Sequence, residues 1–339
     1  MKAGIYYGIN KVGVETIDTP TIAETDVLVT NVRAGICGTD ISAYRYGGEP
    51  VAIFPNGEFG HEMVGIVAEV GSKVIDVNVG DRVFVNPSTC KRIGKFKCDT
   101  AGAFSEYVCV EDAKWDYNLF KLKDEVSFDE AVIIEPFAVG THGKNIVNTT
   151  NNDHVVVYGA GTIGLSAMAA VLAQGNKNVA VIDNNEIRLN LVKELGGIPI
   201  NFSTENVQEK LKEIFGSVYN VMGQQVANVD VIIDCAGAPN ILADAIANAK
   251  DSVRVSLLAT AQSAVTVYPA MIMANEVLIK GSCGYTNDDV KEVINNVNEK
   301  RVDLSKIVTH HFKLDQLEDA FAFANDPKNN TIKVVIDFE

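Results

Sequence analysis

The fold is decided by Val-Val-Val-Tyr-Gly-Ala-Gly-Thr-Ile-Gly at residues 155–164. The β-branched run at its start is typical of a parallel strand that is covered on both faces. Gly159 permits a sharp turn, Gly161 lets a pyrophosphate approach the backbone, and Gly164 lets the following helix lie close to the strand. That helix would point its free N–H groups and the positive end of its dipole at the phosphates. We interpret the stretch as a strand, a turn and a helix that bind a dinucleotide.

An acidic residue follows at the offset that such a site needs. Asp183 closes the next apolar run, Val179–Ile182, nineteen residues after Gly164. Its carboxylate is placed to accept hydrogen bonds from both hydroxyls of an adenosine ribose. There are two other interpretations: the uncharged run 155–176 is as long as a membrane span, and the glycines could form a purely structural turn. The acid at this offset and the return to a strand pattern favour dinucleotide binding over both.

Length and composition are those of a two-domain globular enzyme. The chain has 339 residues, of which 47% are hydrophobic, enough for two cores. Its formal charge of −15 argues against nucleic acid and anionic membrane surfaces as partners. Residues 1–16 lack the apolar core of a signal peptide, and the six cysteines are spaced too irregularly for a disulfide framework. We therefore expect a cytoplasmic protein.

Residues from about 145 to 280 alternate strand and helix patterns. After the opening unit we expect helices at 186–195, 205–215 and 239–249, and strands at 179–183, 198–202, 229–234, 253–258 and 276–279. This order predicts a doubly wound parallel sheet. Residues 1–35 favour a β-rich beginning, and 216–228 form a loop on which the sequence says little. The tail carries helical patterns at 288–299 and 314–324 and a final strand at 333–338.

Three separated pieces of sequence carry metal-ligand chemistry. Cys37 lies between glycines and is followed by Thr and Asp40, His61 and Glu62 follow a glycine, and Glu135 ends an apolar run. Thiolate, imidazole and carboxylate are ligand types that Zn²⁺ accepts, and Asp40 could accept the second ring N–H of His61. Cys37 and His61 could also be ordinary buried side chains. That interpretation leaves Glu62 and Glu135 unexplained in apolar surroundings.

Together these motifs resemble the medium-chain zinc-dependent alcohol dehydrogenases, in the sorbitol (polyol) and threonine dehydrogenase branch. The resemblance covers essentially the whole chain and rests on Cys37-Gly38-Thr39-Asp40, Gly60-His61-Glu62, Gly65, Gly71, Val74 and Glu135-Pro136. It implies an α/β protein in which a doubly wound Rossmann cofactor domain is inserted into a β-rich GroES-like catalytic domain. The expected boundaries are 1–144 plus 281–339 for the catalytic domain and 145–280 for the cofactor domain.

The resemblance also implies roles for particular residues. Cys37 and His61 would bind zinc, Glu62 or Glu135 would fill a further position, and Thr39 would take the proton of the substrate alcohol. The candidate cofactor-binding residues are Gly159, Gly161, Thr162, Ile163, Gly164, Asp183 and Arg188. The implied reaction is hydride transfer between a secondary alcohol, such as a polyol or diol, and NAD. NAD is expected over NADP because a carboxylate repels a 2′-phosphate.

The sequence departs from the family pattern in two places. Many relatives have four cysteines that bind a structural zinc, whereas residues 86–107 contain only Cys90 and Cys98. Two thiolates do not close a tetrahedral site, so we expect one catalytic zinc per chain, no structural zinc and two free thiols. The basic residues among 91–97 are expected to form a solvated face. Ser42 stands where a proton-relaying His is usual, and it cannot hold a proton near neutral pH.

Two positions that face the substrate in sorbitol dehydrogenases also differ. Ala43 stands in the place of a Tyr, with Tyr44 beside it, and His311 stands in the place of an Arg. Both changes remove donors suited to several hydroxyls, so we expect a short secondary alcohol, a diol, or a polyol other than sorbitol. The alternative is that Tyr44 and His311 rebuild a sorbitol site.

Two further hypotheses concern function. A zinc-free quinone or enone reductase shares the fold, but the candidate ligands argue against it. A non-catalytic structural or binding relative is disfavoured because the metal and nucleotide motifs are intact. Relatives associate through the last strand of the cofactor sheet, which corresponds to 276–279 here, so we expect a homodimer or homotetramer.

Overall fold

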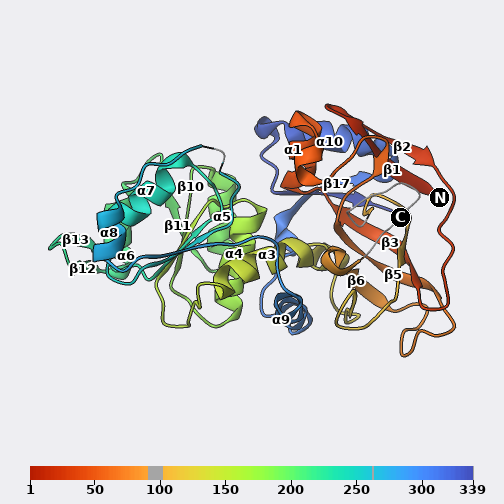
Figure 1. Ribbon diagram of the computed structural model, residues 1–339, viewed down its shortest axis with the longest axis horizontal. Coiled ribbons are helices and arrows are strands. Elements are labelled where there is room, and N and C mark those ends of the chain that lie inside the picture. Colours follow the sequence, from red (N-terminus) through yellow and green to blue (C-terminus); the bar gives the residue numbers. More distant parts are fainter. Residues whose placement is uncertain (91–101, 262, 339) are drawn as a thin grey trace. The chain divides into compact units, whose positions relative to one another are not determined.

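The computed structural model describes residues 1–90, 102–261 and 263–338, which form two compact units. Unit 1 comprises Met1–Glu135 and Val297–Glu339, and unit 2 comprises Pro136–Asn296. Unit 2 is therefore inserted into the chain of unit 1 (Figure 1). The expected limits of the cofactor domain, 145 and 280, fall inside unit 2 and stay a prediction.

Unit 1 is built on two sheets. The larger has seven strands: six follow the order β17-β18-β3-β5-β6-β8, and β7 pairs with β3. Their bounds are β3 (Val27–Gly35), β5 (Glu62–Val70), β6 (Arg82–Val85), β7 (Tyr107–Val110), β8 (Leu119–Lys121), β17 (Val308–Lys313) and β18 (Lys333–Asp337). The smaller sheet, in the order β2-β1-β4, consists of β1 (Lys2–Gly8), β2 (Lys11–Thr16) and β4 (Gly57–Glu58). Because β18 lies between β17 and β3, the tail of the chain completes this unit.

The helices of unit 1 close its core. They are α1 (Gly38–Tyr46), α2 (Phe128–Ala131) and α10 (Leu317–Asn325). Phe321 of α10 packs against the rings of Tyr44, Phe59 and Phe104, with centroid distances of 5.6, 5.4 and 5.6 Å. Aromatic pairs at these distances add favourable geometry to the burial of large apolar surfaces. Short 3₁₀ helices lie at Glu49–Val51, Pro87–Thr89, Ser305–Ile307, Leu314–Gln316 and Pro327–Asn329.

Unit 2 contains the predicted doubly wound sheet. Six parallel strands follow the order β11-β10-β9-β14-β15-β16, the strand order of a dinucleotide-binding fold. The strands are β9 (Val155–Tyr158), β10 (Val179–Asp183), β11 (Ile198–Asn201), β14 (Val231–Asp234), β15 (Arg254–Leu257) and β16 (Leu278–Gly281). Successive side chains of β9 enter different cores: Val156 packs with α6 and α7, whereas Val155 and Val157 are fully buried outside that core.

The helices of unit 2 are α3 (Ile134–Asn145), α4 (Thr162–Ala173), α5 (Glu186–Glu194), α6 (Val207–Phe215), α7 (Pro239–Ala247), α8 (Pro269–Ala274) and α9 (Asn287–Asn298). Some of them, such as α5 and α6, start at a side-chain cap. The side chain of Asn206 accepts a hydrogen bond from Glu209 N at 3.1 Å, so α6 begins two residues later than expected. Pro239 occupies the first turn of α7, as predicted.

Two expectations about unit 2 need correction. The last strand begins at Leu278 and not at Glu276, because Glu276 has a φ of +49°, in the left-handed region. The segment 216–228 is not a plain loop: it folds into a hairpin of β12 (Ser217–Tyr219) and β13 (Gln225–Ala227).

In the described residues, no helix combines the length and the apolar character needed to cross a membrane.

Candidate active site and cofactor site

The site in unit 1 forms where β3 ends and β5 begins. Cys37 follows β3 at the N-cap of α1, and His61 and Glu62 lie at the start of β5. The strands are antiparallel neighbours with Gly35 opposite Glu62, so their pairing brings the two motifs together. In the described part of the chain, the ligand atoms of Cys37, His61 and Glu62 all lie within 4.8 Å of one another. Cys37 and His61 are half-buried and Glu62 is fully buried, so Glu62 forms the floor of the cluster.

Asp40 holds the backbone of the cysteine in place. Its Oδ2 accepts a hydrogen bond from Cys37 N at 2.9 Å, which closes the first turn of α1. Its Oδ1 lies 3.9 Å from His61 Nδ1, longer than a hydrogen bond, so the expected bond to the ring N–H is not formed in this structure. Thr39 is half-buried, and its Oγ1 lies 3.4 Å from Cys37 Sγ.

Lys333 forms a buried ion pair with Glu62. Its Nζ lies 2.6 and 2.8 Å from the two carboxylate oxygens of Glu62 and donates to Ile36 O at 3.0 Å. Burial alone lowers the pKa of Lys333, but the charges of Glu62, Cys37 and Glu135 outweigh it and raise that pKa. The lysine is therefore charged. A Cβ on Gly35 would lie 2.1 Å from Glu62 Oε2, so this position must be glycine for the carboxylate to fit.

The charges around His61 show what the cluster can hold. Burial lowers the pKa of His61, but its interactions with Cys37, Asp40 and Glu135 together raise that pKa well above its ordinary value. These three groups thus favour a positive charge at the imidazole, whether a proton or a metal ion. Glu135 is buried in the first turn of α3, and its charge acts on both His61 and Lys333, yet it is not part of the three-residue cluster. The donor set fits a zinc ion.

Unit 2 contains a pocket of about 740 Å³ at the carboxyl ends of its strands, a volume in the usual range of small-molecule sites. Its lining comes from the ends of β9, β10 and β11 and from α6 and α7. Three candidate cofactor residues, Gly159, Asp183 and Arg188, line it. We call it the nucleotide pocket.

The glycine turn is shaped as expected. Gly159 has a φ of +93°, and a Cβ on Gly164 would lie 1.7 Å from Gly159 O, so both positions require glycine. A Cβ on Gly161 would meet only the Nη1 of Arg188, at 3.9 Å. The chain itself therefore leaves open space over Gly161. Thr162 and Ile163 form the first turn of α4.

Asp183 ties the turn to the end of β10. Its Oδ2 accepts from Ala160 N at 2.7 Å, and its Oδ1 accepts from Asn184 N at 2.7 Å and Asn185 N at 2.9 Å. A carboxylate has about four acceptor positions, so about one remains. That is fewer than the two that both ribose hydroxyls would use.

The structure also places the residues that depart from the family pattern. Tyr44 is buried in the core of unit 1 against Phe321, and the carbonyl of Ala43 accepts from the hydroxyl of Tyr6 at 2.8 Å. His311 Nδ1 lies 3.1 Å from an Asp337 oxygen. Cys90 packs against the core of unit 1. Cys98 and the basic residues among 91–97 lie outside the described residues.

The sequence interpretation missed two groups. Lys333 could have been noticed as a charge beside the apolar run Val334–Ile336, which a buried strand tolerates only with a partner. Tyr158, Gln208 and Asn248, which line both the nucleotide pocket and a small adjoining cavity, carry no sequence motif.

Comparison with known proteins places the chain in a family. Residues 23–124 match the alcohol dehydrogenase GroES-like domain, and residues 162–299 match the zinc-binding dehydrogenase domain. Sorbitol dehydrogenase of Bacillus subtilis is 31% identical over 356 aligned positions, covering 99% of this chain and 97% of that protein.

Two solved structures are similar along the whole chain. The crystal structure of 2R,3R-butanediol dehydrogenase from Bacillus subtilis has a TM-score of 0.85 at 26% identity, covering 100% of this chain and 99% of that one. A protein of Escherichia coli CFT073, described as a short chain alcohol dehydrogenase and complexed with the cofactor NADH, has a TM-score of 0.84 at 29% identity with the same coverage. The chain therefore belongs to the medium-chain zinc-dependent alcohol dehydrogenase family, in its polyol and threonine dehydrogenase branch.

Proposed function

We propose that this protein is a zinc- and NAD-dependent dehydrogenase that oxidises a secondary alcohol of the polyol or diol class. The observation that carries the proposal is the convergence of Cys37, His61 and Glu62 on one point in unit 1. The nucleotide pocket beside the glycine turn of unit 2 supports the use of NAD as the cofactor. Relatives that are named as sorbitol and butanediol dehydrogenases support the substrate class.

Zinc, when bound, supplies a Lewis acid that polarises the oxygen of the alcohol and makes its proton easier to remove. Cys37 and His61 would hold it, with Glu62 or Glu135 in a further position. The hydroxyl of Thr39, which lies 3.4 Å from the Cys37 sulfur, accepts the proton of the substrate. Ser42, one turn further along α1, passes it to water, because a hydroxyl relays a proton but does not store one near neutral pH.

The residues of unit 2 bind and orient the dinucleotide. The open space over Gly161 and the free N–H groups at the start of α4 suit a pyrophosphate. Asp183 has about one acceptor position left for a ribose hydroxyl, and Arg188 lines the same pocket. Holding the two reactants in fixed geometry is the main contribution of the protein to such a hydride transfer.

The positions of Tyr44 and His311 support a substrate other than sorbitol. Tyr44 is packed into the aromatic core, and His311 interacts with Asp337, so neither is free to replace the missing donors. Steady-state kinetics with NAD on sorbitol, xylitol, 2,3-butanediol and threonine, followed by NADH absorbance, tests this. We expect a diol or a polyol other than sorbitol to have the highest kcat/KM. A more than tenfold preference for sorbitol would contradict the substrate assignment, and no NADH formation with any alcohol would contradict the function.

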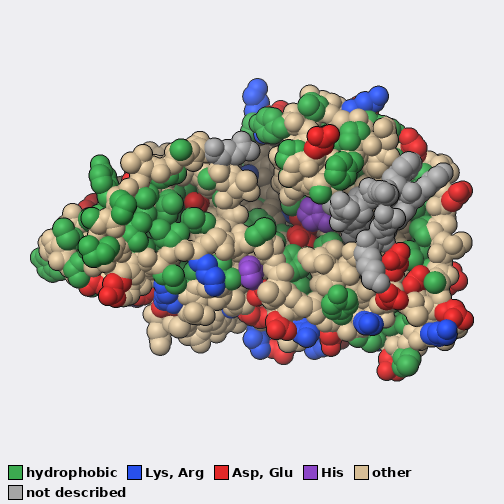
Figure 2. All heavy atoms as spheres, in the orientation of Figure 1, with side chains coloured by type: hydrophobic (Ala, Val, Ile, Leu, Met, Phe, Trp, Pro, Cys, Tyr) green, Lys and Arg blue, Asp and Glu red, His purple; other side chains and the backbone are tan. Residues whose placement is uncertain are grey.

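We also propose that copies of this chain associate through the β16 edge of the unit 2 sheet. β16 pairs only with β15 among the described strands, and Leu278 is exposed, as are Tyr268 and Met273 of the α8 region. Figure 2 shows hydrophobic side chains gathered over the end of unit 2 that carries α8 and the β12–β13 hairpin. Sedimentation of the wild type and of Leu278→Lys tests it, and a wild-type monomer would contradict it. Location in the cytoplasm is part of this proposal and rests on the irregular cysteine spacing.

A further inference from the structure

The hairpin of β12 and β13 carries exposed apolar side chains where it turns, at the same end of unit 2 as α8 (Figure 1). Tyr219, Val221 and Met222 are 72%, 58% and 58% exposed. Single exposed apolar side chains are ordinary on a protein surface, but a group of three at one turn suits contact with another protein. We call these three side chains the hairpin tip.

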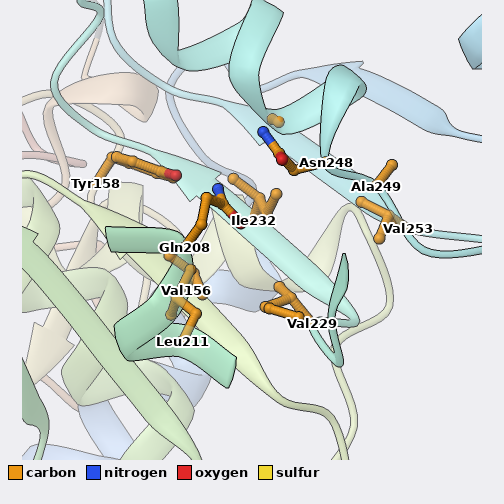
Figure 3. Close-up of a pocket in the computed structure, with 11 residues that line it drawn as sticks. Val156, Tyr158, Gln208, Leu211, Val229, Ile232, Asn248, Ala249 and Val253 are labelled. Atoms are coloured by element: carbon orange, nitrogen blue, oxygen red, sulfur yellow. The ribbon is translucent and has the colours of Figure 1, made fainter. Parts of the chain in front are cut away.

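Hydrogen bonds hold the hairpin tip in a fixed conformation. The side chain of Asn220, only 5% exposed, accepts from Met222 N at 3.1 Å and donates to Ala249 O at 3.2 Å. Val221 N donates to Asp251 Oδ1 at 3.1 Å. Ala249 is itself buried and lines a small apolar cavity in the core of unit 2 (Figure 3). Because the tip is fastened to the core, covering it costs little conformational entropy.

The end of unit 2 around the hairpin tip is poor in charge. Residues 216–229 and 255–275 contain no Asp, Glu, Lys or Arg, in a chain of which 22% of the residues are charged. The second run includes α8, and no residue of that helix is buried. The turn before β15 connects the two runs: it bonds the hairpin, and its Ser252 N donates to Asn275 O at 2.8 Å. The tip therefore belongs to a broader uncharged surface.

A second copy of the same chain fits this surface best. Each copy has a formal charge of −15, so two copies repel each other and approach most easily where neither carries a charge. A strongly charged partner would find no opposite charge on the two runs. An apolar patch, in contrast, is complementary to its own copy across a two-fold axis.

The hairpin tips do not meet each other in the pair of copies proposed at the β16 edge. Two-fold pairing of an edge strand with its own copy is antiparallel, so the amino ends of the two sheets lie at opposite ends of the pair. The hairpin directly precedes β14 in the chain and therefore lies at the amino ends of the strands. Contact between tips needs a second two-fold axis, and two such axes close an assembly of four chains.

A small contact is sufficient in an assembly of this kind. Three side chains cover much less than the roughly 1,200 Å² that a specific interface buries, so the tips alone would not hold two separate chains together. Between two dimers the same contact forms twice. The second contact then forms at a high effective concentration, which strengthens the whole.

We propose that the hairpin tips join two β16-linked dimers into a tetramer, with Tyr219, Val221 and Met222 of one copy packed against the same residues of another. The inference rests on the association through β16 put forward under the proposed function, and it does not depend on the reaction that the protein catalyses.

Sedimentation equilibrium of the whole protein tests the contact. We expect the mass of four chains for the wild type and of two chains for Val221→Lys and for Met222→Lys, because each variant brings like charges together at a desolvated axis. Both positions are exposed in the single chain, so the variants should keep the wild-type circular dichroism spectrum. Ser217→Lys is the matched control. It adds the same charge at the base of the hairpin, opposite Ala227, and should leave four chains.

The outcomes separate the two contacts. A wild type of two chains that Leu278→Lys dissociates overturns the hairpin contact and leaves the association through β16 standing. A four-chain wild type that stays intact in both tip variants also overturns the hairpin contact, as does dissociation of the Ser217→Lys control, because added charge alone would then be the cause. A wild-type monomer overturns both contacts.

Discussion

A lysine that is only 2% exposed faces a glutamate that is fully buried, so neither charge can lose its partner without cost. We predict that Lys333→Met lowers the free energy of unfolding of the metal-free protein by about 3–5 kcal/mol, because it leaves the Glu62 carboxylate buried and unpaired. Denaturant unfolding followed by circular dichroism measures this.

The matched control is the double variant Glu62→Gln/Lys333→Met. It removes both charges and should recover a large part of the lost stability, since no buried charge remains. A single Lys333→Met variant as stable as the wild type would show that water reaches Glu62.

The carboxylate of Asp183 also bears on cofactor choice. We predict that the wild type uses NAD with a kcat/KM at least about tenfold higher than NADP, because a 2′-phosphate would approach a carboxylate held by three backbone N–H groups. Asp183→Asn keeps the size of the side chain and removes its charge. The ratio of kcat/KM with NAD to kcat/KM with NADP should therefore fall by about tenfold. Equal efficiency of the wild type with both cofactors would rule out this role.

At the scale of residues, spacing predicted part of the candidate site. The motifs at 37–40 and 60–62 were assigned to one site, and the pairing of β3 with β5 does bring Cys37, His61 and Glu62 together. Lys333 was missed because its partner is 271 positions away. Such a contact depends on which strands become neighbours, and local sequence carries no record of that.

At the scale of elements, α9 is anchored by its first turn. Asp289 accepts hydrogen bonds from Thr286 N at 2.8 Å, Thr286 Oγ1 at 2.6 Å, Asn145 Nδ2 at 2.8 Å and His142 Nδ1 at 2.8 Å. Burial raises the pKa of Asp289, but these donors outweigh it and lower that pKa below its ordinary value. The contact ties α9 to α3 within unit 2.

We predict that Asp289→Ala costs about 2 kcal/mol of stability at neutral pH. Because the folded protein lowers the pKa of Asp289, the stabilisation is fully present above the unfolded pKa of about 4 and is lost as the pH falls through the lower folded value. Thermal unfolding of both proteins from pH 7 to pH 3 should therefore show the difference in Tm shrinking at the acid end. A constant difference would contradict the assignment to this carboxylate.

Element types were easier to predict than element ends. The β-branched runs and glycine turns identified all six strands of the doubly wound sheet, since their buried faces impose a pattern. The ends depend on single residues, such as the cap at Asn206 and the left-handed backbone at Glu276. The hairpin at 217–227 was missed because its turn lacks an Asn-Gly or Asp-Gly signal.

At the scale of the whole molecule, we predict one zinc per chain. The cluster at Cys37, His61 and Glu62 fits one ion, and Cys90 packs against the core of unit 1. Elemental analysis should give one equivalent of zinc per chain in the wild type and much less in Cys37→Ser. The variant should still fold, because unit 1 has its own aromatic core. Two equivalents in the wild type would contradict this count.

The interleaved chain of unit 1 has a consequence for biosynthesis. Strand β18 pairs with β3 on one side and β17 on the other, yet it is translated after all of unit 2. On the ribosome, unit 2 can complete its own sheet while the edge of β3 that pairs with β18 is still unpaired. Lys333 belongs to that strand, so the charge that faces Glu62 is synthesised only after the whole of unit 2. In a nascent chain, the cluster of Cys37, His61 and Glu62 therefore lacks its compensating positive charge until β18 has been translated.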